Sequence, residues 1–216
     1  MRNIKIFDTT LRDGEQAPKC GMHLSEKIEM ARALERLKVD VIEAGFAICS
    51  KGDFESVQTI AGAIKDCQVA SLARCVKADI DSAYEAVKAA VAPRIHVFLA
   101  TSPIHMQYKL KMSEERVLET VKEMVSYAKS KVSDIEFSAE DATRSEPEFL
   151  VKVIKTAIAA GAKTINIPDT VGYITPGEMG ELIRYLKSSV PELDGVDLSV
   201  HCHNDLGMAV ANSLAA

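Results

Sequence analysis

The sequence predicts an α/β fold, namely a TIM (β/α)8 barrel in which parallel strands lie inside and helices lie outside. Three observations lead to this prediction. Short runs of apolar, β-branched residues recur about every thirty residues, and amphipathic segments of helical period separate them. The turn after the first run, DTTLRDGEQ (8–16), contains a single glycine, whereas a doubly wound nucleotide-binding sheet carries a glycine-rich phosphate motif there.

Seven runs have the length and composition of strands, and each is expected to open one βα unit. They are IKIF (4–7), DVIEAGF (40–46), QVASLA (68–73), RIHVFLA (94–100), DIEFSA (134–139), TINIPD (164–169) and DLSVHCH (197–203). A closed barrel needs an eighth strand, and the sequence ends with the helix after the seventh run. We therefore expect residues 1–216 to form one catalytic barrel domain that is incomplete at its C-terminus.

Helices are expected between the runs because apolar residues recur there at positions i, i+3, i+4 and i+7. This spacing is shown by Met30, Ala33, Leu34 and Leu37, and by Leu150, Val153, Ile154, Ala157 and Ile158. Helix starts are indicated by the capping boxes Ser145–Glu148 and Thr175–Glu178 and by the N-caps Ser25 and Ser113.

Composition excludes several classes of function. The net charge is -5 and the sequence has no basic block, so no nucleic-acid partner is expected. No apolar run approaches the roughly 18 residues of a membrane span, and the N-terminus does not have the pattern of a signal peptide. The five cysteines are odd in number and scattered, which indicates reduced thiols and a cytoplasmic location.

Polar residues gather at the carboxyl ends of the expected strands, where TIM barrels carry their chemistry. They are Arg12, Asp13, Glu43, Arg74, His96, Ser138, Glu140, Asn166, Thr170, His201 and His203. Charged groups in a barrel mouth cost several kcal/mol unless they are paired or bind a metal ion. Their accumulation therefore predicts a functional site.

The stretch SVHCHNDLG (199–207) suggests what that site binds. On a strand, His201 and His203 share one face, so both imidazoles can bind one metal ion. With Asp13 they form a nitrogen and oxygen ligand set that suits a divalent ion such as Mn, Mg, Co or Zn. Such an ion leaves positions open for substrate oxygens and polarises a carbonyl bound to it.

Structural interpretations of the same residues remain open at this point. Asp13 can be a turn residue before Gly14, and Glu43 can be an ion-pair partner of Arg12 or Arg74. His105 and Lys109 are explained by surface solvation nearly as well as by substrate contact. Asp8 is expected to be a structural hydrogen-bond acceptor, and Asn204 and Asp205 are expected to cap the last helix and orient the histidines.

Several motifs resemble those of the 2-isopropylmalate synthases, in order and over essentially the whole chain. They are DTTLRDGEQ, IEAGF, HVFLATSPIHMQYKL, EFSAEDATR, NIPDTVGY and SVHCHNDLGMAVANSLAA. The wider group of metal-dependent Claisen-type enzymes also includes homocitrate synthase, citramalate synthase and hydroxymethylglutaryl-CoA lyase. The resemblance implies condensation of acetyl-CoA with 2-oxoisovalerate to 2-isopropylmalate and CoA, the entry step to leucine.

The resemblance also implies a role for each matching residue. Asp13, His201 and His203 match the metal ligands, and Arg12 matches the arginine that supports the 2-oxo acid and the developing oxyanion. Thr170 matches a contact to the substrate carboxylate. His96, Ser138 and Glu140 match residues near the reacting centre, with Glu140 placed to assist enolisation. Glu43 matches an acidic residue of the family pattern, with a structural or polarising role.

Two alternatives accompany this interpretation. A citramalate or homocitrate synthase differs only in the pocket for the side chain of the 2-oxo acid. The family's fourth metal ligand, an asparagine in an N-G-x-G-E-R-x-G segment at the eighth strand, does not occur in this sequence. A non-catalytic fragment that binds a metal ion and a keto acid is therefore also considered. The open strand edges predict a homodimer.

Overall fold

A computed structural model of the chain describes residues 4–216. Its seven strands follow one another in sequence order in one sheet, β1-β2-β3-β4-β5-β6-β7, and the chain alternates strands with helices. A doubly wound sheet reverses its strand order at a switch point, whereas a TIM barrel keeps the sequence order throughout. The predicted fold class is therefore confirmed for seven of the eight βα units.

The strands agree with the predicted runs except at the first two. They are β1 (Phe7–Asp8), β2 (Val41–Glu43), β3 (Gln68–Arg74), β4 (Pro93–Ala100), β5 (Asp134–Glu140), β6 (Thr164–Asp169) and β7 (Asp197–Cys202). The α-helices are α1 (Leu24–Leu37), α2 (Lys51–Ala63), α3 (Lys77–Val87), α4 (Pro103–His105), α5 (Glu114–Lys131), α6 (Pro147–Ala160), α7 (Pro176–Ser189) and α8 (Ala209–Ala215). A π-helical turn, η2 (Met106–Leu110), continues α4. None of the helices in residues 4–216 has both the length and the apolar character of a membrane span.

The chain divides into two compact units, which we describe separately. The first unit contains the residues up to His96 together with Ser130–Asp134, and the second contains Val97–Lys129 together with Ile135–Ala216. The expectation of one domain over residues 1–216 stays a prediction.

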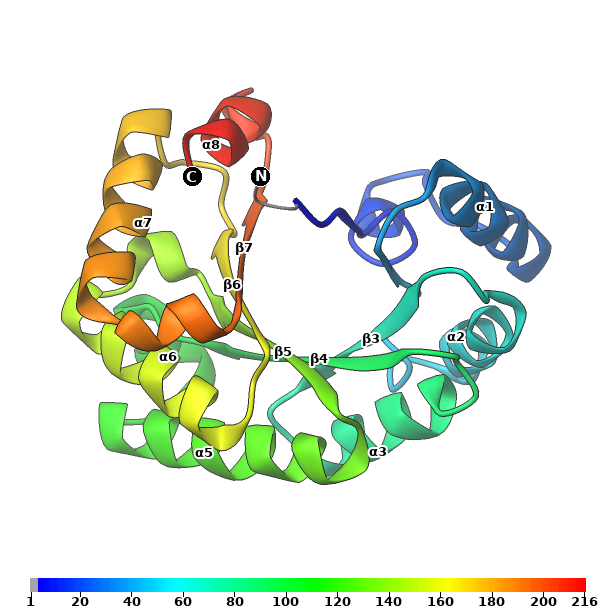
Figure 1. The fold of residues 1–216 in the computed structure, drawn as a ribbon, viewed down its shortest axis with the longest axis horizontal. Helices are drawn as coiled ribbons and strands as arrows, with labels where there is room; N and C mark the ends of the chain where they lie inside the picture. The colour runs from blue at the N-terminus through cyan, green and yellow to red at the C-terminus, as the bar shows by residue number, and fades with distance from the viewer. Residues whose placement is uncertain (1–3) are drawn as a thin grey trace. The chain divides into compact units, whose positions relative to one another are not determined.

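In the first unit, β1, β2 and β3 are parallel neighbours, with Asp8 opposite Ile42 and Ile42 opposite Val69. Helices α1, α2 and α3 pack against one another in sequence order, and α2 and α3 also contact β3 (Figure 1). Ile42, Val69 and Ile60 are fully buried and form part of the core between these layers. The predicted first strand at 4–7 is wrong in its extent, because Ile4 and Ile6 are exposed and the ladder begins at Phe7.

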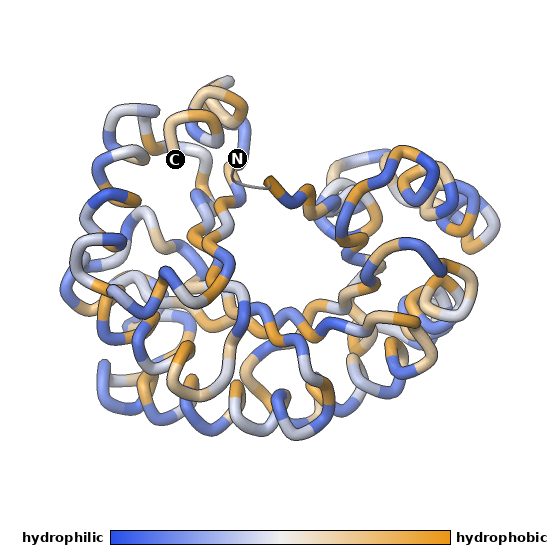
Figure 2. The backbone as a smooth tube through the Cα atoms, viewed as in Figure 1, coloured by the Kyte–Doolittle hydropathy of each residue, from blue (hydrophilic) through white to orange (hydrophobic). Residues whose placement is uncertain are grey.

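In the second unit, β6 and β7 are parallel and paired over six residues, from Thr164 opposite Asp197 to Asp169 opposite Cys202. Helices α6 and α7 lie on one side of these strands, and α8 packs against α7 (Figure 1). Helices α5 and α6 carry both hydrophobic and hydrophilic segments along their length (Figure 2), as expected for helices with one buried face. Phe137 of β5 and Ile165 of β6 are fully buried and form part of the core of this unit.

Two helix starts were predicted correctly and two were not. Thr175 and Glu178 form the expected capping box of α7, and Ser113 Oγ accepts from Arg116 N at the start of α5. Helix α6 begins instead after Glu146, because the Ser145 hydroxyl is engaged by Thr101 and by the Asp141 carbonyl. Helix α1 begins after His23, whose N–H donates to Glu26, so Ser25 lies inside the helix.

The buried face of α1 also differs from the predicted one. Lys27, Ala31 and Leu34 are buried, whereas Met30 and Leu37 are exposed. Lys27 Nζ lies 2.7 Å from Glu15 Oε2, so a charged residue occupies a position that the apolar pattern does not mark. In α6 the pattern is reliable, because Leu150, Val153, Ile154 and Ala157 are buried as expected.

Candidate active site

In the first unit the turn after β1 presents Arg12 and Asp13. The Asp8 carboxylate accepts from Thr10 N at 3.0 Å and from the Thr10 hydroxyl at 3.2 Å, which confirms its expected structural role. The backbone N–H groups of Arg12, Asp13 and Gly14 all point to the Thr9 carbonyl. This tight turn holds the two charged side chains at the carboxyl end of β1.

The turn residue Arg12, Glu43 of β2 and His96 of β4 are joined by hydrogen bonds in this unit. Arg12 Nε donates to Glu43 Oε2 at 2.5 Å, and His96 Nδ1 lies 2.5 Å from Glu43 Oε1. Glu43 is fully buried and His96 is buried, with its ring edge-on to Phe7. One carboxylate therefore orients both a guanidinium and an imidazole.

The geometry of these three residues determines the charge of Glu43. Burial alone raises the pKa of Glu43, but the charges and hydrogen bonds of His96 and Arg12 outweigh it and lower the pKa to about 2. The pKa of Arg12 is raised even though burial opposes this, because Glu43 and Asp13 both stabilise its charge. Glu43 is thus a carboxylate at neutral pH that accepts from both neighbours.

Arg12 also contacts Asp13, with Nη1 3.0 Å from Oδ2. Arg74, the alternative partner of Glu43, instead donates to Asp79 at 2.6 Å and lies over the ring of Phe46. The open question about Glu43 is therefore answered in part, since it pairs with Arg12 and not with Arg74.

In the second unit, His201 is the penultimate residue of β7, and His203 directly follows the strand. Their Nε2 atoms lie 3.2 Å apart, so the two rings converge as the H-x-H spacing predicts. Two nitrogens on one metal ion, each about 2.0–2.1 Å from it, are separated by roughly this distance. The pair therefore fits the donor geometry of a divalent metal site, and each ring is half-buried.

The loop behind these histidines is held by β6 and α8. His203 N donates to the Asp169 carbonyl at 3.2 Å, which extends the strand pairing past β7. Asn204 Oδ1 accepts from Ala209 N at 3.1 Å and so satisfies the first N–H of α8, although the N-cap residue itself is Met208. Asp205 does not share this role in the structure: its carboxylate lies against Gly172, which has a φ of +60°.

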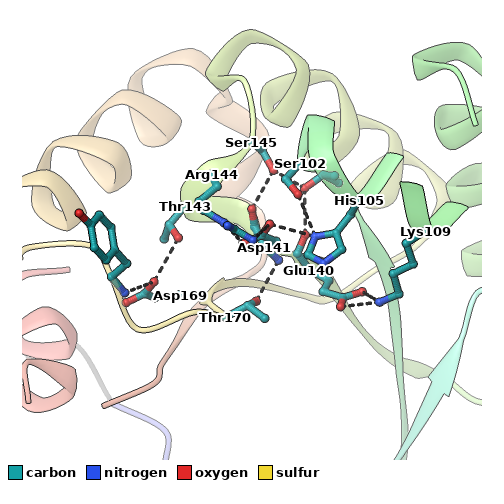
Figure 3. A network of polar contacts seen from close by, with 12 residues as sticks. Ser102, His105, Lys109, Glu140, Asp141, Thr143, Arg144, Ser145, Asp169 and Thr170 are labelled. Atoms are coloured by element: carbon teal, nitrogen blue, oxygen red, sulfur yellow. Dashed lines mark hydrogen bonds and ion pairs between the residues drawn. The ribbon is translucent and has the colours of Figure 1, made fainter. Parts of the chain in front are cut away.

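A second polar cluster gathers around Asp141 at the carboxyl end of β5 (Figure 3). The Asp141 carboxylate is completely buried and accepts from Arg144 at 2.7 and 2.8 Å. Its Oδ2 also lies 2.9 Å from His105 Nδ1, and its backbone N–H donates to Thr170 Oγ1 at 2.9 Å. Burial alone raises the pKa of Asp141, but Arg144, Ser102 and His105 outweigh it and lower the pKa.

Three further predicted residues lie in this unit. Glu140, next to Asp141, is held by Lys109, whose Nζ lies 2.6 and 2.8 Å from the two carboxylate oxygens (Figure 3). Ser138 Oγ is buried and accepts from Asn166 Nδ2 at 2.8 Å. Thr170 already accepts from Asp141 N, so its own hydroxyl proton is available for another acceptor.

The predicted site residues thus fall into two groups. Arg12, Asp13, Glu43 and His96 lie in the first unit, and Ser138, Glu140, Thr170, His201 and His203 lie in the second. Sequence reasoning missed Asp141 as the centre of a network. The available signal was its position beside Glu140 with Arg144 three residues later.

Comparison with known proteins identifies the family of this chain. The model of the HMGL-like family matches residues 3–216, essentially the whole chain. The chain belongs to the HMGL-like family. Among curated relatives, this HMGL-like chain is 61% identical to the 2-isopropylmalate synthase of Ruminiclostridium cellulolyticum and 62% identical to that of Halothermothrix orenii. Both matches cover 100% of the chain but 42% of the relative, so the HMGL-like chain spans less than half the length of these proteins.

Solved structures support the fold. The hydroxymethylglutaryl-CoA lyase of Pseudomonas aeruginosa superimposes with a TM-score of 0.80 at 23% identity, covering 98% of the HMGL-like chain and 72% of the lyase. An HMG-CoA lyase from Acinetobacter baumannii, solved with coenzyme A and 3-methylmalate, gives a TM-score of 0.79 at 20% identity, with coverages of 98% and 70%. At these identities the likeness shows the fold alone.

Proposed function

We propose that this chain carries the catalytic barrel of a 2-isopropylmalate synthase. The reaction joins the methyl carbon of acetyl-CoA to the ketone carbon of 2-oxoisovalerate, and water then releases CoA to give 2-isopropylmalate, the entry to leucine synthesis. The observation that carries the proposal is the convergence of His201 and His203, with Nε2 atoms 3.2 Å apart. The names of curated relatives at 61% and 62% identity support the same assignment.

The proposed metal ligands are Asp13 of the first unit and His201 and His203 of the second. One carboxylate and two imidazoles suit Mn, Mg, Co or Zn, and we propose Mn. When bound, the divalent ion supplies Lewis-acid polarisation of the ketone. Asn204 accepts from the first N–H of α8 behind the histidines and limits the freedom of the loop that carries His203.

The residues of the first unit stabilise negative charge on oxygen. We propose that Arg12 donates to the oxygen that becomes negative when the carbon–carbon bond forms. Glu43 fixes the orientation of Arg12 through Nε and that of His96 through Nδ1. Because the guanidinium is held before substrate arrives, little reorganisation is needed during the reaction.

The residues of the second unit are proposed to bind the 2-oxo acid and to remove a proton from the methyl group of acetyl-CoA. Thr170 can donate its hydroxyl proton to the substrate carboxylate, since its oxygen already accepts from Asp141 N. Ser138 of this unit and His96 of the first unit are both proposed to contact substrate. Glu140 assists removal of a proton from the methyl group of acetyl-CoA.

A panel of 2-oxo acids tests the choice of substrate. We expect the chain, supplied with Mn²⁺ and acetyl-CoA, to release free thiol fastest with 2-oxoisovalerate. Preference for pyruvate would instead indicate a citramalate synthase, and preference for 2-oxoglutarate a homocitrate synthase. Metal binding without turnover would indicate a non-catalytic fragment that binds a metal ion and a keto acid.

Calorimetric titration with Mn²⁺ tests the metal site separately from turnover. Replacing a ligand, as in His203→Asn, is expected to weaken Mn²⁺ binding by about 10-fold or more. His23→Asn is the matched control, because His23 is exposed at the start of α1. Equal affinity in the two variants would contradict the proposed ligand set.

Two assembly expectations accompany this function. We propose that the protein works in the cytoplasm, with its five cysteines as free thiols. We also propose a homodimer formed through open strand edges. Sedimentation equilibrium over a range of protein concentrations would show a monomer throughout if the second proposal is incorrect.

A further inference from the structure

Lys109 lies on the π-helical turn η2, which continues α4, and its side chain contacts Glu140. Its Nζ lies 2.6 Å from Oε1 and 2.8 Å from Oε2, so one ammonium engages both carboxylate oxygens (Figure 3). A carboxylate has about four lone-pair positions, and this contact leaves some of them open. The pair thus fixes the direction of the carboxylate without using all of its capacity to accept a proton.

The segment that carries Lys109 is anchored at a second point. His105, four residues earlier, has its Nδ1 2.9 Å from Asp141 Oδ2 and 2.9 Å from Ser102 Oγ. Residues four apart share one face of a helical segment. Two side chains of one face therefore reach two adjacent residues at the end of β5.

Adjacent residues of a regular strand point to opposite faces. Asp141 breaks this alternation because its φ is 63°, in the left-handed region. Its backbone N–H is held by Thr170 and its carboxylate by Arg144, which stabilise the unusual conformation. Glu140 and Asp141 can consequently both face the segment that carries His105 and Lys109 (Figure 3).

Folding stability does not explain the Lys109–Glu140 pair well. The Lys109 side chain is 48% exposed and that of Glu140 is 19% exposed. Ion pairs this accessible to water contribute little to stability. Holding one carboxylate in one direction is, however, what a proton-transfer group requires.

We propose that Lys109 is a positioning residue that holds the Glu140 carboxylate in one orientation for removal of the acetyl-CoA methyl proton. The inference rests on the proposed function, because it assigns Lys109 to the same reaction. His105 and Asp141 anchor the segment and so set the distance from which Lys109 reaches Glu140. Lys109 itself does not touch the substrate.

Three variants test this role. In Lys109→Met, kcat is expected to fall about 10- to 100-fold, while the KM for 2-oxoisovalerate changes less than about threefold. Lys109→Arg should restore most of kcat, because a guanidinium can also donate to both oxygens. Lys111→Met is the matched control, because Lys111 is an exposed lysine directly after the same turn and this variant removes the same charge. It should keep the parent kcat.

The outcomes separate this inference from the proposed function. A Lys109→Met enzyme with the parent kcat, or an equal loss in Lys111→Met, would overturn the role of Lys109 while leaving the reaction intact. If the parent shows no turnover with any 2-oxo acid, the proposed function fails for this chain. Amide hydrogen exchange of residues 106–110 then tests the Lys109–Glu140 contact itself. Faster exchange only in Lys109→Met supports this contact, and equal rates in all variants refute it.

Discussion

Arg12 and Glu43 are joined by a 2.5 Å hydrogen bond from Nε to Oε2, although 31 residues separate them in the sequence. The Glu43 side chain is fully buried and that of Arg12 is 14% exposed. Removing one partner of a buried ion pair leaves the other charge without compensation. The pair therefore links the stability of the first unit to the position of a proposed catalytic group.

Glu43→Gln is expected to destabilise the protein by about 3–5 kcal/mol, because Arg12 and His96 both lose an anionic partner. Urea unfolding at pH 7 measures this loss. Glu55→Gln is the control, since Glu55 pairs with Lys51 at the surface and should change stability by less than about 1 kcal/mol. Equal losses of stability in the two variants would show that the hydrogen bonds of Glu43 with Arg12 and His96 contribute no more than a surface ion pair.

Lowering the pH should remove the contribution of Glu43 to the free energy of unfolding over a defined range of pH. The pKa of Glu43 falls from 4.5 to about 2 in the folded protein, a difference that corresponds to about 3 kcal/mol. Because the folded pKa lies below the ordinary value, this contribution is complete above pH 5 and is lost as the pH falls towards 2. Urea midpoints of the parent and of Glu43→Gln should therefore converge between pH 5 and pH 2. A constant gap across this range would contradict the depressed pKa.

Gly172→Ala should disturb the loop that carries His203. A Cβ atom at Gly172 would collide with the Asp205 carboxylate, and the φ of +60° is itself unfavourable for alanine. We expect a loss of about 1–3 kcal/mol in stability together with weaker Mn²⁺ binding. Thermal unfolding and calorimetry measure the two effects. Gly177→Ala is the control, because nothing lies within 4 Å of the added atom there.

Divalent metal should stabilise the folded chain through the two histidines. A ligand at 100 times its dissociation constant raises the free energy of unfolding by about 2.7 kcal/mol when only the folded state binds it. Mn²⁺ is therefore expected to raise the Tm of the parent, and a chelator to reverse the rise. The double variant His201→Asn, His203→Asn should show no shift. A shift of the same size in that variant would place the metal elsewhere.

Much of the architecture was predictable because it depends on local periodicity. The runs at 134–139 and 164–169 are within one residue of β5 and β6, and the Thr175–Glu178 capping box was predicted residue by residue. Helix starts failed where a tertiary contact competed. The Ser145 hydroxyl binds Thr101, 44 residues away, and is not the cap of α6.

The candidate site was predictable in its residue types but not in its pairing. Glu43 had two arginines as plausible partners, and only the structure shows Arg74 held by Asp79. Asp141 gave no periodic signal, because its importance comes from a left-handed backbone conformation and from three partners on different segments. Contacts between residues that are far apart in the sequence depend on how their segments pack, and local sequence patterns do not specify that packing.

The sequence by itself determined the order of strands and helices and the H-x-H spacing that directs two imidazoles to one face. These properties follow from the periods of 2 and 3.6 residues, which act within a few residues of each other. The tertiary structure decided which charges meet: Arg12 with Glu43, Lys109 with Glu140, and His105 with Asp141. Those choices arise only when distant segments are packed, because burial then penalises every charge that is left without a partner.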